Sequence, residues 1–221
     1  MNLNNYLVEE AEVELWVNGV LKTIFACTPE AVKELAVGHL ACEGMINGLS
    51  ECEIEEISPL KVSVRIPADC RREEKERKQL KISLPELQSL AKEMFSRAEI
   101  YKRGGGIHCA ALTDGTGLLA FKEDIGRQNA LDKIAGEALI KGLRLDQLIY
   151  ISSGRINTEI MAKAKNCGFP LVVSRSLVST LACGEAKKNR IGLIGRIITP
   201  QPILYNPLGI DPAPLIEQKF A

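Results

Sequence analysis

The sequence lacks most of the features that would assign it to a metal-binding, secreted or nucleic-acid-binding class. No two of its seven cysteines are separated by two residues, the Cys-x-x-Cys spacing of zinc knuckles and redox dithiols. Basic and acidic side chains balance at 28 each, so no overall field draws the protein to nucleic acid or to a membrane surface. No apolar run near the amino end has the length of a signal peptide or a membrane span. We therefore expect a cytoplasmic protein without structural zinc.

The cysteines are odd in number and scattered among apolar neighbours, which favours reduced thiols over a disulfide framework. Four of them lie beside alanines on predicted helix or strand faces and are interpreted as small core residues: Cys42, Cys109, Cys167 and Cys183. Cys70 differs, because it lies in the charged run 69–81 next to Arg71 and Arg72. Exposure and positive charge favour a thiolate, so Cys70 is either a reactive thiol or an incidental surface cysteine.

The first half of the chain predicts a small α+β unit. Apolar and polar residues alternate on both sides of Asn18-Gly19, which is a strong hairpin signal. Thr28 and Pro29 then predict the start of a helix that runs to about Gly44. One or two strands follow before Pro67, the run 69–81 is interpreted as a mobile surface loop, and an amphipathic helix is expected over 84–100.

After three consecutive glycines the pattern changes to strands that alternate with helices of ten to fifteen residues. This alternation predicts a mostly parallel, three-layer α/β sheet. We place a boundary near Lys102, with the α+β unit over 1–101 and the α/β unit over 102–221.

Two loops of the second unit carry candidate binding residues, because ligands of α/β sheets bind beyond the carboxyl ends of the strands. Gly126-Arg127 and Gly154-Arg155 each follow a predicted strand, and each is expected to open a helix. Free backbone N–H groups and a guanidinium together suit a phosphate, and two such loops favour a nucleotide or a ligand with several phosphates. Alternatively, the glycines only turn the chain and the arginines are solvated.

Among the titratable residues, His108 follows the three glycines and starts an apolar strand, so it is either a structural histidine or a ligand-binding one. His39 lies on the apolar face of a helix and is interpreted as core. Asp124 and Asp132 are expected to pair with Arg127 and Lys133 on a helix surface. Zinc deaminases share a three-layer fold of this kind, but Ala110 stands where their His-x-Glu motif requires glutamate, which excludes that activity.

Five segments, in order, resemble the FdhD family of formate dehydrogenase accessory proteins: "TPEAVKELAVGHLACEGMI", "GGGIHCAAL", "EDIGRQNALDK", "SSGRINTEIMAKAKNCGFPLVVSRS" and "GLIGRI". The resemblance implies a three-layer cytidine-deaminase-like α/β domain with a mixed sheet and no zinc, plus a smaller α+β domain, in a homodimer. It implies that sulfur from a cysteine desulfurase passes to a molybdenum bis(molybdopterin guanine dinucleotide) cofactor, or a related guanine nucleotide complex, destined for a molybdenum or tungsten formate dehydrogenase.

The same resemblance implies a set of site residues. The cofactor-binding residues would be Gly105, Gly106, His108, Gly126, Arg127, Ser153, Gly154, Arg155, Gly195 and Arg196. Cys70 would carry the sulfur, although "ADCRREEKERKQLK" replaces the family's Cys-Gly-x-Cys-Gly loop. Gln128 stands where the family usually has histidine, and Ile198 and Gln201 stand at its usual arginine positions. Three functions remain open: a sulfurtransferase, a non-catalytic cofactor chaperone, and a nucleotide-binding scaffold.

Overall fold

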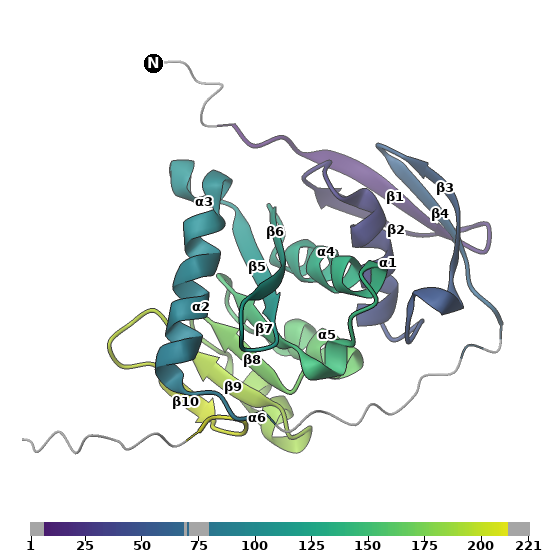
Figure 1. The fold of residues 1–221 in the computed structure, drawn as a ribbon. Helices are drawn as coiled ribbons and strands as arrows, with labels where there is room; N and C mark the ends of the chain where they lie inside the picture. Colours follow the sequence, from purple (N-terminus) through teal and green to yellow (C-terminus); the bar gives the residue numbers. More distant parts are fainter. Residues whose placement is uncertain (1–6, 69, 71–79, 212–221) are drawn as a thin grey trace, which may run out of the picture.

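A computed structural model describes residues 7–68, 70 and 80–211. They form a mixed α/β structure with two mixed β-sheets and six α-helices (Figure 1). Most of the charged run 69–81, with Arg71 and Arg72, lies outside the described residues, so the loop predicted there stays a prediction. No helix in the described part of the chain is both long and apolar enough to cross a membrane.

The first sheet has the order β2-β1-β4-β3, and its strands are β1 (Ala11–Val17), β2 (Val20–Cys27), β3 (Glu53–Ser58) and β4 (Lys61–Arg65). The hairpin predicted at Asn18-Gly19 is confirmed, and both residues have the positive φ, 52° and 77°, that a tight two-residue turn requires. The Asn18 side chain also bonds both backbone groups of Ile66, which fixes the hairpin to the end of β4.

Helix α1 (Val32–Cys42) begins later than the sequence predicts, and Thr28 does not cap it. The Thr28 hydroxyl and amide donate instead to the Asp124 carboxylate, 96 residues further along the chain. Ala31 occupies the cap position with a φ of 56° and no side-chain cap bond. A long-range contact therefore overrides the local capping signal.

The second sheet has the order β10-β9-β8-β7-β5-β6. Its strands are β5 (His108–Thr113), β6 (Leu118–Asp124), β7 (Ile149–Ser152), β8 (Leu171–Ser174), β9 (Gly192–Gly195) and β10 (Ile203–Asn206). The expectation of a mostly parallel sheet is wrong, because only β7, β8 and β9 pair in parallel. The short connection that joins β5 to β6, and the reversal before β10, make the remaining pairs antiparallel.

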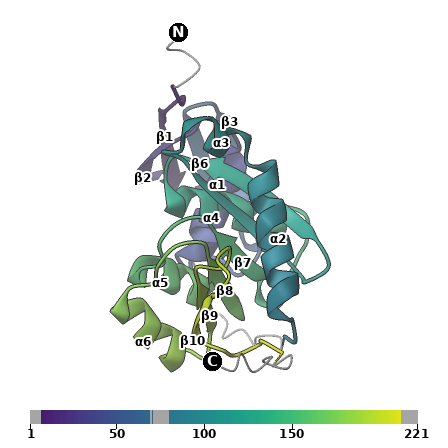
Figure 2. The same cartoon turned by 90° about the vertical axis from the view of Figure 1, so that its left-hand side faces the viewer.

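Helices cover both faces of this sheet (Figures 1 and 2). The helices α4 (Arg127–Ile140), α5 (Thr158–Cys167) and α6 (Thr180–Lys188) lie on one side, and α2 (Leu84–Arg97) lies on the other. The single helix expected over 84–100 is two helices, because the chain leaves helical geometry at Ala98 before α3 (Glu99–Gly104). The boundary near Lys102 stays a prediction, and α2, which precedes it, packs on the second sheet.

One hydrophobic core joins the two sheets through α1 and α4. It contains the inner face of β1 and β4, α1, α4, α5 and the adjoining face of the second sheet. The two helices approach each other through glycines: a Cβ on Gly38 would lie 1.7 Å from the Asp132 carbonyl oxygen, and one on Gly136 would lie 1.9 Å from that of Glu34. Only glycine permits backbones this close.

Substituting either glycine should therefore separate α1 from α4. We expect Gly38→Ala and Gly136→Ala each to lower the free energy of unfolding by ~3 kcal/mol, at the upper end of overpacking costs. Gly184→Ala is the matched control, because Gly184 is also helical and nothing lies within 4 Å of its added Cβ. Urea denaturation followed by circular dichroism measures the difference; equal midpoints for all three variants would contradict the close contact.

Candidate functional site

The predicted binding residues meet at one edge of the second sheet. The carboxyl ends of β7, β8 and β9 lie at this edge because these strands are parallel. The antiparallel hairpin of β5 and β6 brings the first residue of β5, His108, directly opposite the last residue of β6, Asp124. Loops from four strands and the entry to a fifth thus converge, which is where ligands bind in sheets of this kind.

Asp124 is fully buried and organises the loop before α4. Its carboxylate accepts hydrogen bonds from the Gly126 amide at 2.8 Å and the Asn129 side chain at 3.0 Å. The Lys133 ammonium lies 2.6 Å from the other carboxylate oxygen and also donates to the Thr28 hydroxyl. Asp124 and Lys133 therefore form a buried pair, not the surface pairing that the sequence predicts.

Asp132 likewise pairs inside the molecule. Its carboxylate binds the Lys163 ammonium at 2.8 and 2.6 Å, and the His39 Nδ1 lies 3.0 Å away. The His39 ring packs edge-on against Phe25, at 4.9 Å between centroids. The interpretation of His39 as a structural residue is confirmed, whereas no sequence pattern indicated that Lys163 would pair with Asp132.

Arg127, Gly154 and His108 come into direct contact. A Cβ on Gly154 would lie 3.1 Å from the His108 Nδ1 and 3.2 Å from the Arg127 Cβ, so the absence of a side chain lets the three residues meet. The Arg127 Nε is buried and has no hydrogen-bond partner among the described residues. Its nearest carboxylate, that of Glu159, is 60% exposed and 4.0 Å from Nη2. A buried donor left unpaired is costly, and an anionic ligand oxygen would satisfy it.

The two predicted Gly-Arg loops differ in structure. Arg127 is the first residue of α4, with Gly126 at its cap and no side chain closing the helix end, as the sequence predicts. Arg155 does not begin a helix, because α5 starts at Thr158 and the Asn157 side chain accepts from the Ile160 amide. Arg155 instead lies exposed in the loop after β7, and Gly154 is held there by the Ser152 hydroxyl at 3.0 Å.

His108 is half-buried among positive charges. Burial is the main cause that lowers the pKa of His108, and the guanidiniums of Arg127 and Arg155 lower it further, while Asp124 acts in the opposite direction. Its Nδ1 lies 3.4 Å from the Ser153 hydroxyl, which accepts from the Cys109 amide at 3.0 Å. The imidazole is therefore neutral near pH 7 and is able to share a proton with a ligand oxygen.

The remaining predicted residues lie at the same edge or lead into it. Gly105 and Gly106 both have positive φ, 70° and 74°, and join α3 to β5. Gly195 ends β9, and Arg196 follows it with a φ of 54°, which is strained for a residue with a side chain. Among the described residues, none of these four forms a hydrogen bond or an ion pair with Arg127.

Sequence reasoning missed Arg175, which directly follows β8. A cavity of about 330 Å³ opens there, and it is lined by Ser153, Arg175, Ser176, Ile198 and Thr199. A sequence signal was present: ligands of α/β sheets bind beyond the carboxyl ends of the strands, and Arg175-Ser176 directly follows β8 as Gly126-Arg127 and Gly154-Arg155 follow β6 and β7.

The described cysteines differ in reactivity. Burial raises the pKa of Cys109 to about 12 and that of Cys27 to about 11, so both are protonated thiols, and the interpretation of Cys109 as core is confirmed. Cys42 and Cys167 are also buried, with their sulfurs 3.3 Å apart, whereas Cys183 is half-exposed. The half-buried Cys70 thiol donates to the Glu51 carboxylate at 2.9 Å.

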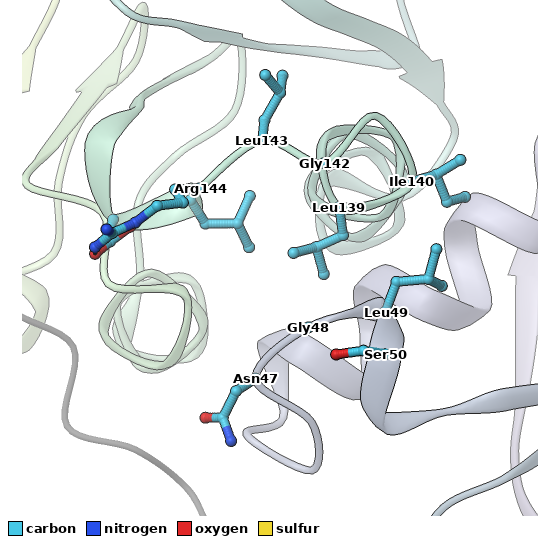
Figure 3. A pocket seen from close by; sticks show the side chains of 11 residues that line it. Asn47, Gly48, Leu49, Ser50, Leu139, Ile140, Gly142, Leu143 and Arg144 are labelled. Atoms are coloured by element: carbon cyan, nitrogen blue, oxygen red, sulfur yellow. The ribbon is translucent and has the colours of Figure 1, made fainter.

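Glu51 also accepts a hydrogen bond from the amide of Asn47, which lines a second, larger cavity of about 670 Å³. Figure 3 shows the end of α4, with Leu139 and Ile140, facing Leu49 and Ser50 across it. The one arginine in its lining, Arg144, is already bonded to Asp146. Because α4 has 14 residues, this cavity lies ~20 Å along the helix from Arg127.

Comparison with known proteins gives consistent results. The FdhD/NarQ family profile matches residues 8–83 and 67–208. The chain is 31% identical to a sulfur carrier protein FdhD of Bacillus subtilis (strain 168) over 86% of this chain and 84% of that protein. It is 28% identical to a protein of the same description from Shouchella clausii (strain KSM-K16), over 89% and 86% of the two chains.

A solved structure shares the fold. It is the crystal structure of a candidate formate dehydrogenase accessory protein from Desulfotalea psychrophila, with a TM-score of 0.78 and 22% identity over 90% of this chain and 86% of that one. The mixed α/β architecture is thus one that a natural protein adopts.

The environment of His108 predicts how the site responds to pH. The pKa of His108 is lower in the folded protein than in the unfolded chain. As the pH falls through ~6.5, the unfolded chain therefore binds a proton before the folded protein does, and the free energy of unfolding decreases. Arg127→Met removes a repulsive charge, so we expect the pKa of His108 to rise. Histidine NMR titration, assigned with His108→Gln, measures this.

Arg65→Met is the control for this titration, because Arg65 lies in the first sheet and pairs with Glu55. An unchanged His108 titration in Arg127→Met would show that the two side chains do not interact.

Proposed function

The chain belongs to the FdhD/NarQ family, and we propose that it is an accessory protein for the maturation of a molybdenum or tungsten formate dehydrogenase. In this proposal it binds a molybdopterin guanine dinucleotide cofactor, or a related guanine nucleotide, and transfers sulfur to it from a cysteine desulfurase. The protein would act in the cytoplasm as a homodimer. The names of the relatives support the sulfur-carrier and formate dehydrogenase parts of the proposal.

The unpaired Arg127 Nε is the observation that carries cofactor binding. It lies beside Gly154 and the neutral His108, at the start of a helix whose first amides have no acceptor inside the helix. A phosphate fits this donor set, because it offers several oxygens to a guanidinium and to helix-end amides at once. When bound, the cofactor supplies the metal that receives the sulfur.

The roles of the side chains follow from this geometry. Arg127 binds a phosphate and Gly154 lets Arg127 and His108 approach each other, while His108 donates or accepts one hydrogen bond without adding charge. Arg155 and Arg196 are exposed at the same edge and add attraction at longer range. Asp124 pairs with Lys133 and positions the loop without touching the ligand.

Sulfur transfer would use Cys70. Its thiolate attacks the outer sulfur of the desulfurase persulfide, so a new bond forms to Cys70 and the desulfurase cysteine leaves as thiolate. An external thiol then attacks the Cys70 sulfur, forms a mixed disulfide and releases the outer sulfur as sulfide for the cofactor. An external thiol is needed because the segment 69–81 contains no second cysteine.

A second candidate function is that of a cofactor chaperone, or nucleotide-binding scaffold, without sulfur transfer. It is favoured by the Glu51 carboxylate, which accepts a hydrogen bond from the Cys70 thiol; a negative charge beside the sulfur opposes formation of the nucleophilic thiolate. It is also favoured by the position of Cys70, near the end of α4 opposite to Arg127.

Cofactor binding is tested with guanosine diphosphate in calorimetry. We expect the wild-type protein to bind it, and Arg127→Met to weaken binding at least about tenfold, because a charge-assisted hydrogen bond is lost. Arg65→Met, which removes an exposed arginine in the first sheet, should bind like the wild type. If Arg127→Met and Arg65→Met bind guanosine diphosphate with equal affinity, Arg127 does not contact the nucleotide.

Sulfur transfer is tested by incubating the protein with a cysteine desulfurase and cysteine, then mapping any added sulfur by mass spectrometry. We expect one sulfur atom on Cys70 in the wild type and none in Cys70→Ser. Cys183→Ser is the matched control, because Cys183 is also half-exposed. If the folded wild-type protein carries no added sulfur on Cys70, sulfur transfer is contradicted and the cofactor chaperone, or nucleotide-binding scaffold, is the function that remains.

A further inference from the structure

Two buried cysteines that the proposed function does not use lie in contact with each other. Cys42 is the last residue of α1 and Cys167 is the last residue of α5, and both side chains are fully buried. Both are reduced, and their sulfurs are 3.3 Å apart although the two residues are 125 positions apart in the chain. The fold therefore brings thiols from two distant segments together.

The backbones at this contact are held independently of the sulfurs. The Asn166 side-chain amide donates to the Cys42 carbonyl oxygen at 2.7 Å, so the end of α5 is bonded to the end of α1. Gly168, with a φ of 80°, ends α5 and donates its amide to carbonyl oxygens of the last turn. Because a disulfide bond is ~2.05 Å long, the sulfurs need to approach by about an ångström, which is the scale of a side-chain rotation.

The two thiols lie just beneath the surface, at helix ends. Glu43, which follows Cys42, is exposed, and Asn166, which precedes Cys167, is half-exposed. The ends of helices open more readily than their middles. A small uncharged oxidant such as hydrogen peroxide therefore gains access here, whereas a large or charged reagent is excluded.

A lysine lies on the same helix face as Cys167, one turn earlier. The Lys163 ammonium binds the Asp132 carboxylate and lies 3.5 Å from that of Glu43. Burial is the main cause that raises the pKa of Cys42, and the hydrogen bond with Cys167 raises it further, while the charge of Lys163 acts in the opposite direction. Cys42 is therefore a thiol at rest, and Lys163 is the cation that favours its thiolate when one forms.

We propose that Cys42 and Cys167 are a modification site, which hydrogen peroxide or another small hydroperoxide oxidises to a disulfide that joins α1 to α5. One cysteine, as thiolate, attacks a peroxide oxygen and becomes a sulfenic acid; the O–O bond breaks, and the released hydroxide leaves as water with the thiol proton. The second sulfur then attacks the sulfenic sulfur and expels its hydroxyl, which leaves as water with the second thiol proton. Two thiols and one peroxide thus give one disulfide and two waters.

The disulfide would connect the two halves of the molecule covalently. Helix α1 packs in the core with the first sheet, and α5 covers the second sheet, so the bond closes a loop across most of the intervening chain. A cross-link over a long loop removes conformational freedom from the unfolded chain and so stabilises the folded one. Neither nucleotide binding nor Cys70 takes part in this modification.

Mass spectrometry tests whether the bond forms. The folded, reduced protein is treated with hydrogen peroxide, its remaining thiols are blocked with iodoacetamide in urea, and it is digested without reduction. We expect a pair of peptides cross-linked through Cys42 and Cys167, which dithiothreitol separates. Cys27→Ala is the matched control, because Cys27 is also fully buried, and this variant should form the same cross-link. Two unmodified thiols, or sulfinic acid without the cross-link, would overturn the proposal.

Thermal unfolding tests the effect of the bond on stability. Peroxide treatment should raise the melting temperature of the wild type by at least about 5 °C, and dithiothreitol should reverse the shift. Cys42→Ala and Cys167→Ala should show no rise, whereas Cys27→Ala should show the full one. The comparison of oxidised with reduced wild type needs no variant, so it decides the question even if an alanine variant fails to fold. A cross-linked protein whose melting temperature does not rise would contradict the stabilising effect.

Discussion

The buried carboxylate of Asp124 is the contact on which the rest of the structure depends. It ends β6 opposite His108, and it binds the amide before α4, the Lys133 ammonium inside α4, and Thr28 from the first half of the chain. A charge buried this deeply is tolerated only when it is paired and fully hydrogen-bonded. Its partners therefore have little freedom, and the position of Arg127 follows from theirs.

Helix α4 transmits this constraint in two directions. Its first residue presents Arg127 to the edge of the second sheet, and its glycine contact with α1 joins it to the first sheet. Its last turn forms a wall of the larger cavity, close to Glu51 and Cys70. The candidate anion-binding residues thus lie at the start of α4, whereas the Cys70 thiol bonds Glu51, which in turn bonds Asn47 in the wall of the cavity at the other end of the helix. In the proposed function, sulfur would have to pass a distance comparable to the length of α4.

The chemistry available at the sheet edge is mainly electrostatic. Arg127, Arg155, Arg175 and Arg196 supply positive charge, while the acids nearby are largely committed: Asp124 to Lys133, and Glu123 to the amides of Ile100 and Tyr101. His108 adds a neutral imidazole whose protonation the surrounding arginines oppose. Such an arrangement of charges is suited to a multiply charged anion, as proposed above.

The sequence alone determined the features that depend on neighbouring residues. Asn18-Gly19 specified a hairpin, Gly126 preceded a helix as predicted, and the pattern after the three glycines indicated strands that alternate with helices, because turn geometry and periodicity are local properties. Only the tertiary structure decided that Thr28 bonds Asp124 instead of capping α1 and that Arg175 lies beside a cavity. Those outcomes depend on partners about 20 to 100 residues away, and no local pattern encodes which distant side chain will satisfy a buried group.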